Sequence, residues 1–372
     1  MRKIFEETRI NQITLRNRLV RSATWEDMAD GSGRPTERIF EAYEALAEGG
    51  VGMIITGCTF VVPGDQFYPG MMGMWGDDLV EAFRPLTEMV HRHGCRIVQQ
   101  LAYGGSQGAR TAGELPVWGP SAVADRLTGT EPTPMTVHDI QALIKAFGDA
   151  AERAKAAGFD GVQLHGAHGY LLGQFLSPHY NRRDDEYGGS IENRARIFVE
   201  LHDEIRGRVG EEFAVMIKIN SDDFTENGAG IDECLYVCKA LARRGIDAIE
   251  VSGGTAASSD HMVRRKIDRP EREAYHAEAA ARIAAETGVP VILVGGVRSP
   301  EVMERLLGAT GIAYFSFARP LLAEPDLPNR WRSGDRSRAR CISCNLCQKG
   351  SPEGNICAMR EKPGIVGNTP RT

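Results

Sequence analysis

The stretch HDIQALIKAFGDAAERAKAAGFDGVQLHG, from His138 to Gly166, contains the unit from which the fold is predicted. Apolar residues recur at helical spacing over 138–157, and Gly158 follows, which is typical of a helix that ends in the left-handed conformation. The short run 161–166 is a predicted strand, and its apolar character indicates burial on both faces of a parallel sheet.

Helix and strand alternate in this way along most of the chain. Further buried strands are expected at 19–22, 52–57, 96–102, 215–220, 248–253, 291–296 and 312–318. Further helices are expected at 37–48, 78–93, 191–209, 232–244 and 272–287. About eight alternations predict a parallel sheet closed into a (β/α)8 TIM barrel. An open, doubly wound sheet is the weaker alternative, because no G-x-G-x-x-G motif follows the first strand.

The composition limits the class of protein. Of 372 residues, 42% are hydrophobic and 25% are charged, which is ordinary for a globular protein. The net charge of −6 provides no basic surface for nucleic acid, and no apolar run approaches the ~18 residues that span a bilayer. Because residues 1–7 also lack an apolar signal region, we expect a cytoplasmic protein. Its expected partner is a small-molecule substrate, with no nucleic acid and no membrane, and a homo-oligomer stays open.

A short extension is expected to follow the barrel, which we assign to residues 1–325, with the extension at 326–372. The extension contains four of the 8 cysteines, in the pattern C-x2-C-x2-C-x9-C: Cys341, Cys344, Cys347 and Cys357. Four thiolates at this spacing suit an iron–sulfur cluster or a zinc ion. A segment that holds no metal is the third alternative, and a disulfide is less expected in a cytosolic chain.

Two strand ends near the end of the barrel indicate a phosphate site. The seventh predicted strand ends at Gly295 and Gly296, and the eighth at Ala318 and Arg319. Barrels commonly bind phosphate between these two loops, where glycines let the backbone approach and an arginine can bond two oxygens. The alternative is that the glycines form turns and that the arginine is solvated.

The fourth predicted strand ends in a group of chemically active side chains, His165, His168 and Tyr170. Two histidines could bind a metal, but no third ligand with suitable spacing is evident. They could instead donate hydrogen bonds to a substrate oxygen, with the phenol placed to give a proton. The remaining alternative is a packed loop whose polar groups are satisfied internally.

Lys218 lies within an apolar predicted strand, where burial without a negative partner would be costly. It could pair with a structural carboxylate, or its charge could serve a bound cofactor. Together with the phosphate site and the amide of Gln99 or Gln100, a fixed cation suits flavin mononucleotide, whose reduced ring carries negative charge. A glycosidase would need two facing carboxylates, and Glu250 has no convincing partner in the sequence.

Three segments then resemble the old yellow enzyme family of FMN-dependent oxidoreductases, over nearly the whole barrel. They are LRNRLV (15–20), HGAHGYLLGQFLSPHYNRRDDEYGGSIENRARI (165–197) and FSFARPLLAEPDL (315–327). The resemblance implies an ene reductase that takes hydride from NAD(P)H through the flavin and passes it to an activated alkene. Trp25 stands where one branch of the family has a redox-tuning cysteine, so that tuning is expected to be absent. It also lies close to where the amine-oxidising branch tethers its flavin covalently, so we expect a non-covalent flavin.

The resemblance also implies a role for individual residues. His165 and His168 would hold the substrate oxygen, and Tyr170 would protonate the α-carbon. The residues that would contact FMN are Ser22, Ala23, Thr24, Cys58, Gln100, Lys218, Gly295, Gly296, Ala318 and Arg319.

The cysteine pattern is similar to the [4Fe-4S] segment of dienoyl-CoA reductase and trimethylamine dehydrogenase, the larger members of this family. In those proteins a further FAD- and nucleotide-binding region follows, so within these 372 residues a cluster would have no electron partner other than the flavin. Two alternative functions stay open: an oxidative amine demethylase that passes electrons through the cluster, and an electron-transfer subunit.

Overall fold

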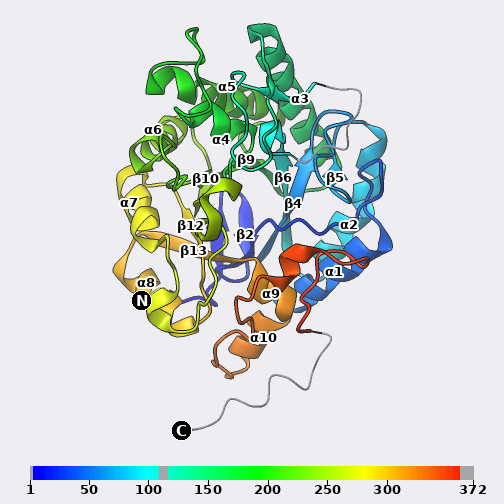
Figure 1. Ribbon diagram of the computed structural model, residues 1–372. Helices are drawn as coiled ribbons and strands as arrows, with labels where there is room; N and C mark the ends of the chain where they lie inside the picture. The colour runs from blue at the N-terminus through cyan, green and yellow to red at the C-terminus, as the bar shows by residue number, and fades with distance from the viewer. Residues whose placement is uncertain (1–2, 109–115, 361–372) are drawn as a thin grey trace.

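Eight parallel strands form a closed barrel in the computed structural model, which describes residues 3–108 and 116–360 (Figure 1). In order around the barrel they are β3 (Leu19–Arg21), β4 (Met53–Phe60), β6 (Arg96–Ala102), β9 (Gly161–Gly166), β10 (Ala214–Asn220), β11 (Ala248–Ser252), β12 (Val291–Val294) and β13 (Ile312–Phe317). The barrel closes because β13 pairs with β3, and β3 also pairs with β4. The predicted (β/α)8 barrel is therefore confirmed.

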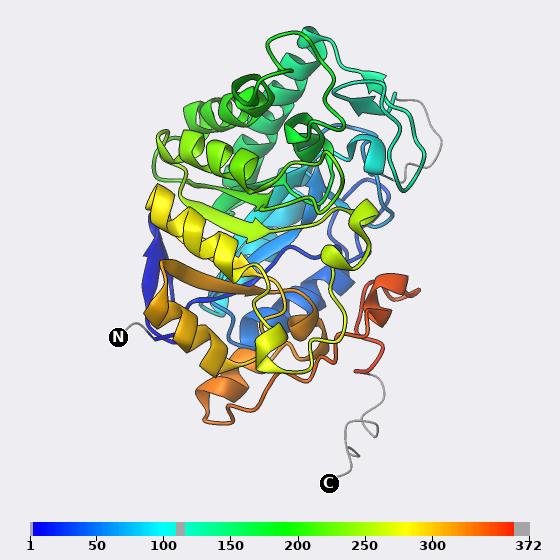
Figure 2. The same cartoon turned by 60° about the vertical axis from the view of Figure 1, so that its left-hand side comes forward.

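Seven helices connect the strands and cover the outside of the barrel (Figure 2). They are α1 (Glu37–Glu48), α2 (Asp78–Arg92), α3 (Val137–Ala156), α5 (Ile191–Val209), α6 (Ile231–Ala242), α7 (Ala277–Thr287) and α8 (Pro300–Ala309). Each buries apolar side chains toward the sheet, as Leu143 and Phe147 of α3 do. The start of α3 is set by Thr136 and Asp139, whose side chains each accept the other's backbone N–H.

Shorter elements occupy the two ends of the barrel. The hairpin of β1 (Thr8–Ile10) and β2 (Ile13–Leu15) packs its apolar side chains against the barrel interior at the amino ends of the strands. Around the carboxyl ends lie β5 (Met72–Gly73), β7 (Trp118–Gly119), β8 (Thr133–Pro134) and α4 (Leu171–Leu176). Because apolar side chains fill the amino end of the barrel, we expect the binding and catalytic residues at the carboxyl end.

The structure corrects several predicted boundaries. The helix expected at 272–287 begins only at Ala277, because a 3-10 turn at Pro270–Arg272 precedes it and Tyr275 donates its backbone N–H to the carbonyl of Gly295. The strand expected at 291–296 ends at Val294, and the strand expected at 52–57 continues to Phe60. The helix α8 was not predicted.

The extension lies beside the carboxyl ends of the strands, on the opposite side from the β1–β2 hairpin (red and blue in Figure 2). It follows α9 (Arg319–Ala323), includes α10 (Leu327–Arg332) and is tied to the barrel where Ala339 donates its N–H to the carbonyl of Arg298. The division at residue 325 stays a prediction, and residues 361–372 of the predicted extension lie outside the described residues. In the described part of the chain, no helix has the length and apolar character to cross a membrane.

Candidate active site

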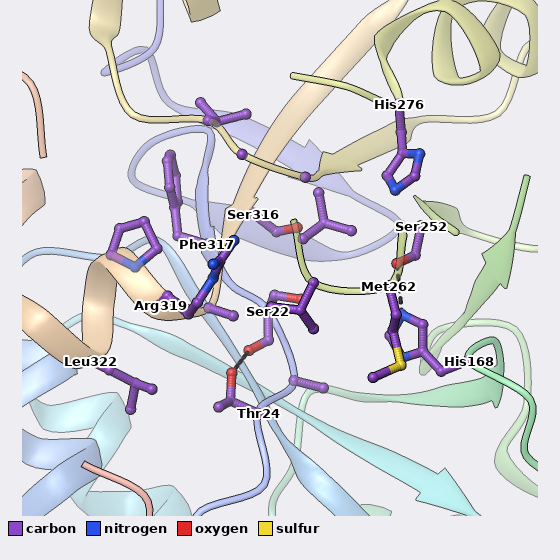
Figure 3. Close-up of a pocket in the computed structure, with 18 of the residues that line it drawn as sticks. Ser22, Thr24, His168, Ser252, Met262, His276, Ser316, Phe317, Arg319 and Leu322 are labelled. Carbon is purple, nitrogen blue, oxygen red and sulfur yellow. Dashed lines mark hydrogen bonds between the residues drawn. The ribbon is translucent and has the colours of Figure 1, made fainter. Parts of the chain in front are cut away.

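A cavity of about 200 Å³ opens at the carboxyl ends of the strands (Figure 3). The predicted cofactor residues that line it are Ser22, Ala23, Thr24, Lys218, Gly295, Gly296, Ala318 and Arg319, together with His168. Figure 3 shows His168 and Ser252 on one side of the cavity, and Arg319 and Leu322 on the other. The sequence segments that predicted a phosphate site and a reactive site thus face one another across a single space.

The phosphate end depends on glycine at Gly295 and Gly296. Their φ angles are 125° and 75°, in the region that favours glycine. A Cβ atom at Gly295 would also lie 2.8 Å from ring atoms of Tyr275 and His276, so a larger residue would displace both rings. The backbone at Gly295 and Gly296 therefore carries no side chain where an anion would approach its N–H groups.

Two arginines lie at this end. The guanidinium of Arg319 donates to the backbone carbonyl of Arg264 and to the side chain of Asn345. Arg298, which the sequence did not indicate, also lines the cavity and is buried, and its Nε has no hydrogen-bond partner among the described residues. A buried donor without a partner costs free energy, which an anion bound here would offset.

The floor of the cavity is a buried polar network centred on Glu250. Lys218 Nζ lies 3.4 Å from Glu250 Oε1 and 2.8 Å from Ser22 Oγ. Ser22 and Ser316 donate their hydroxyl hydrogens to the same carboxylate oxygen, at 2.6 and 2.7 Å. The negative partner that Lys218 was expected to need is therefore Glu250, its neighbour in the pairing of β10 with β11.

The network continues around the barrel through two amides. Gln163 donates from Nε2 to Glu250 Oε2 at 2.9 Å, and Gln100 donates from Nε2 to Gln163 Oε1 at 2.7 Å. Burial alone would raise the pKa of Glu250, but Lys218 and these hydrogen bonds outweigh it and hold the pKa below its ordinary value. Glu250 is therefore a carboxylate at neutral pH.

The structure brings the three predicted catalytic side chains together. The ring centroid of His165 lies 4.9 Å from that of Tyr170 and 5.4 Å from that of His168. The backbone of His168 has a positive φ of 63° and is held by its N–H bond to Asn220 Oδ1. Its Nε2 lies 2.7 Å from Ser252 Oγ. The imidazole of His168 lines the cavity, whereas His165 and Tyr170 lie next to it and do not line the cavity.

Both imidazoles are neutral. Burial, reinforced by the charge of Lys218, lowers the pKa of His165 to about 3 and that of His168 well below its ordinary value. The backbone N–H of Ala167 donates to His165 Nδ1 at 3.4 Å, so Nδ1 is the acceptor nitrogen and Nε2 carries the hydrogen. His165 Nε2 is thus an N–H donor for a ligand oxygen.

Tyr170 lies in an aromatic group outside the lining of the main cavity. Its ring contacts those of Phe67 and Tyr68, and its hydroxyl hydrogen-bonds to Tyr68 and Gln107. Burial raises the pKa of Tyr170 well above its ordinary value, so the phenol keeps its proton. Cys58 packs in the same group, and burial raises its thiol pKa to about 12. A protonated acid therefore stands beside the two imidazoles.

A second cavity, of about 470 Å³, is lined by all four predicted metal ligands: Cys341, Cys344, Cys347 and Cys357. All four are free thiols. Four thiols gathered at one cavity suit an iron–sulfur cluster or a zinc ion, and which of the two binds stays a prediction.

The cysteine segment also forms part of the first cavity. Cys347, Gln348 and Asn355 line that cavity, and Cys347 lines both. The side chain of Asn345 donates to the carbonyl of Val263 at 2.9 Å, and that of Asn355 donates to the carbonyl of Trp25 at 2.8 Å. The two sites therefore share a wall.

Sequence reasoning missed several residues of these sites. Gln163 could have been found, because it is a polar residue two positions before the predicted His165 on an otherwise apolar strand. Glu250 was noticed in the sequence, but its partner Lys218 lies on another strand. No local pattern identifies Arg298, Asn345 or Asn355, whose roles depend on contacts between segments far apart in sequence.

The hydrogen-bond donors and acceptors of these residues match the chemical groups of flavin mononucleotide. The glycine backbone and two arginines suit the phosphate, while Lys218 and Ser22 present donors on the floor of the same cavity. Gln100 uses its Nε2 on Gln163, and its carbonyl oxygen is an acceptor. Gln100 and Cys58 do not line the cavity, and their contact with FMN stays a prediction.

Comparison with known proteins agrees with this fit. The chain is 35% identical to an NADH oxidase of Thermoanaerobacter brockii over 372 residues, which covers 98% of the chain and 56% of that protein. It is 35% identical to an NADPH dehydrogenase of Halalkalibacterium halodurans over 305 residues, 81% of the chain and 87% of that protein. The chain thus spans little more than half of the first relative and most of the second.

A solved histamine dehydrogenase from Rhizobium sp. 4-9 has the same fold, with a TM-score of 0.83, 28% identity and coverage of 92% of this chain and 50% of that one. The family model for NADH:flavin oxidoreductase / NADH oxidase matches residues 3–337 and so includes every strand of the barrel. From this match and the relatives it follows that the chain belongs to that family, the FMN-dependent, NAD(P)H-oxidising enzymes of the old yellow enzyme type.

Proposed function

We propose that this flavin-dependent oxidoreductase is an ene reductase, which reduces the activated C=C bond of an enone or a related electron-poor alkene. The observation that carries the proposal is the convergence of two neutral imidazoles with a protonated phenol, at ring-centroid distances of 4.9 and 5.4 Å from His165. These groups suit a substrate whose oxygen gains negative charge while a neighbouring carbon gains a proton.

FMN, when bound, supplies hydride transfer from NAD(P)H to the β-carbon of the alkene. His165 and His168 bind the carbonyl or nitro oxygen through N–H groups. Because both imidazoles are neutral, they stabilise developing negative charge by hydrogen bonding and do not protonate the oxygen.

Tyr170 gives its hydroxyl proton to the α-carbon. One NAD(P)H and one proton are consumed for each C=C bond reduced, and the phenol regains its proton from solvent. Tyr68, which is partly exposed and hydrogen-bonded to Tyr170, lies on that route. Truncation of the acid would therefore affect the reduction of the alkene and not the oxidation of the nicotinamide.

The test is a pair of anaerobic half-reactions on the FMN-loaded protein. We expect NADH or NADPH to bleach the flavin absorbance rapidly, and 2-cyclohexenone to restore it with formation of cyclohexanone. Bleaching by methylated amines, without bleaching by either nicotinamide, would contradict the proposal.

One observation favours a second candidate, an amine dehydrogenase that passes electrons outward. Cys347 lines both cavities, so a [4Fe-4S] cluster on Cys341, Cys344, Cys347 and Cys357 would adjoin the flavin. The likeness to histamine dehydrogenase supports the same idea. Two neutral N–H donors suit an anionic oxygen better than a cationic amine, and for that reason the ene reductase is preferred.

A further inference from the structure

Glu250 lies directly behind the cavity floor and does not line the cavity itself. Its carboxylate accepts from Lys218, Ser22 and Ser316 on one side, at distances of 3.4, 2.6 and 2.7 Å to Oε1. All three of these donors line the cavity. Glu250 is thus one hydrogen bond away from the groups that a bound flavin would contact.

Its other oxygen is linked through hydrogen bonds to two buried amides that do not line the cavity. Gln163 donates to Glu250 Oε2, and Gln100 donates to Gln163. These bonds fix the orientation of both amides. The Gln163 carbonyl accepts from Gln100 Nε2, so the Gln100 carbonyl oxygen remains as the acceptor for a flavin N–H. One carboxylate therefore orients both Lys218 and Gln100, the two residues expected at the pyrimidine edge of the flavin.

The charges of this network nearly cancel. Lys218 and Glu250 are 3% and 0% exposed, and Coulomb interactions between such buried groups are screened far less than at the surface. Lysine alone would favour the reduced flavin, which carries negative charge. Glu250, close behind the same ammonium, opposes that effect.

We propose that Glu250 is a positioning residue that sets the reduction potential of the bound FMN, by fixing the ammonium of Lys218 and offsetting its charge. With Glu250 present, the flavin is harder to reduce than it would be with Lys218 alone. Once reduced, it is also a stronger hydride donor. The inference rests on FMN occupying this cavity and does not depend on which alkene is the substrate.

The experiment is an anaerobic dye-equilibration measurement of the flavin midpoint potential, with a chemical reductant, so that its outcome is independent of substrate. Glu250→Gln keeps the shape of the side chain but removes its charge and replaces one acceptor oxygen with a donor NH2 group. We expect the equilibrium between oxidised and reduced flavin to shift at least tenfold toward reduced, about +30 mV for a two-electron couple. Glu250→Asp, which keeps the charge, should stay within threefold of the wild type.

A matched control lies at the amino end of the same strand. Asp247 forms an ion pair with Arg206, with Oδ2 and Nη2 2.7 Å apart, next to the first residue of β11. Asp247→Asn removes a partly buried carboxylate far along the strand from the cavity, and it should leave the flavin potential unchanged. A shift equal to that of Glu250→Gln would show a general effect of weakened packing and would overturn the proposal.

A double variant keeps the test decisive if Glu250→Gln does not fold. Lys218→Met together with Glu250→Gln removes both charges and leaves no unpaired ion in the core. Because the pair is nearly neutral overall, we expect its potential to lie close to that of the wild type and above that of Lys218→Met alone. A double variant as low as the single variant, or an unchanged potential in Glu250→Gln, would overturn the proposal.

Discussion

Lys218 and Glu250 form a buried ion pair in the barrel interior, with Nζ and Oε1 3.4 Å apart. The sequence left two interpretations of Lys218 open, a cation for the flavin or a lysine neutralised by a structural carboxylate. In the structure the lysine both lines the cavity that we assign to FMN and contacts the carboxylate. The two interpretations of Lys218 are therefore compatible.

Lys218→Met should lower the flavin reduction potential, because the negative charge of the reduced ring would lose its cation. We expect the equilibrium between oxidised and reduced flavin to shift at least tenfold toward oxidised flavin. This corresponds to a change in midpoint potential of about −30 mV for a two-electron couple. Anaerobic titration against redox dyes measures it. An unchanged potential would remove Lys218 from its predicted role at the flavin ring.

Tyr170→Phe should slow the reoxidation of reduced flavin by 2-cyclohexenone by about 10²-fold, the lower range for loss of a general acid. Reduction of the flavin by NADH or NADPH should stay within twofold, since no proton from Tyr170 is needed in that step. Stopped-flow absorbance follows both half-reactions. Equal slowing of the two would contradict the assignment of Tyr170 as the proton donor.

Glu26→Gln should change how stability depends on pH. Burial raises the pKa of Glu26 from 4.5 to about 7, although Arg21 and the hydroxyl of Tyr43 oppose the shift. Because the pKa of Glu26 is higher in the folded than in the unfolded protein, protonation of Glu26 favours folding. This contribution to the free energy of unfolding is complete below pH 4.5 and falls by about 3 kcal/mol as the pH rises through 7. The wild type should thus lose stability relative to Glu26→Gln between pH 5 and 8 in denaturant titrations; parallel curves would contradict this.

Asn345→Ala should weaken FMN binding, because Asn345 holds both Arg319 and the carbonyl of Val263 at the cavity wall. Loss of these contacts should raise the Kd about tenfold, as expected for one to two hydrogen bonds. Quenching of FMN fluorescence by the apoprotein measures the Kd. Glu353→Ala, at an exposed position in the same extension, is the control and should bind as the wild type does.

Protein purified without oxygen should contain about four iron and four sulfide per chain, if the four cysteines hold the cluster that their spacing favours. Cys344→Ser should lose most of the iron while keeping FMN. Cys95→Ala, at a buried thiol elsewhere in the barrel, should keep both. Zinc in place of iron would contradict the prediction of an iron–sulfur cluster.

Much of the barrel follows from local patterns. The strands β6 and β9 and the helices α1 and α5 have the predicted bounds, because burial on both faces and helical periodicity are written in adjacent residues. The start of α7 was predicted too early, because the helical periodicity of its alanine-rich sequence continues upstream of Ala277. Tyr275 and His276 instead pack against Gly295, in the loop after β12.

The sequence by itself determined the order of strands and helices, the polar residues at strand ends and the spacing of the cysteines, since each depends on neighbours along the chain. Only the tertiary structure decided that Glu250 neutralises Lys218, that Arg298 lies at the phosphate end, and that the cysteine segment walls the flavin cavity. These contacts join residues tens to hundreds of positions apart. Closure of the barrel brings them together, and no local pattern of burial or propensity encodes such a pairing.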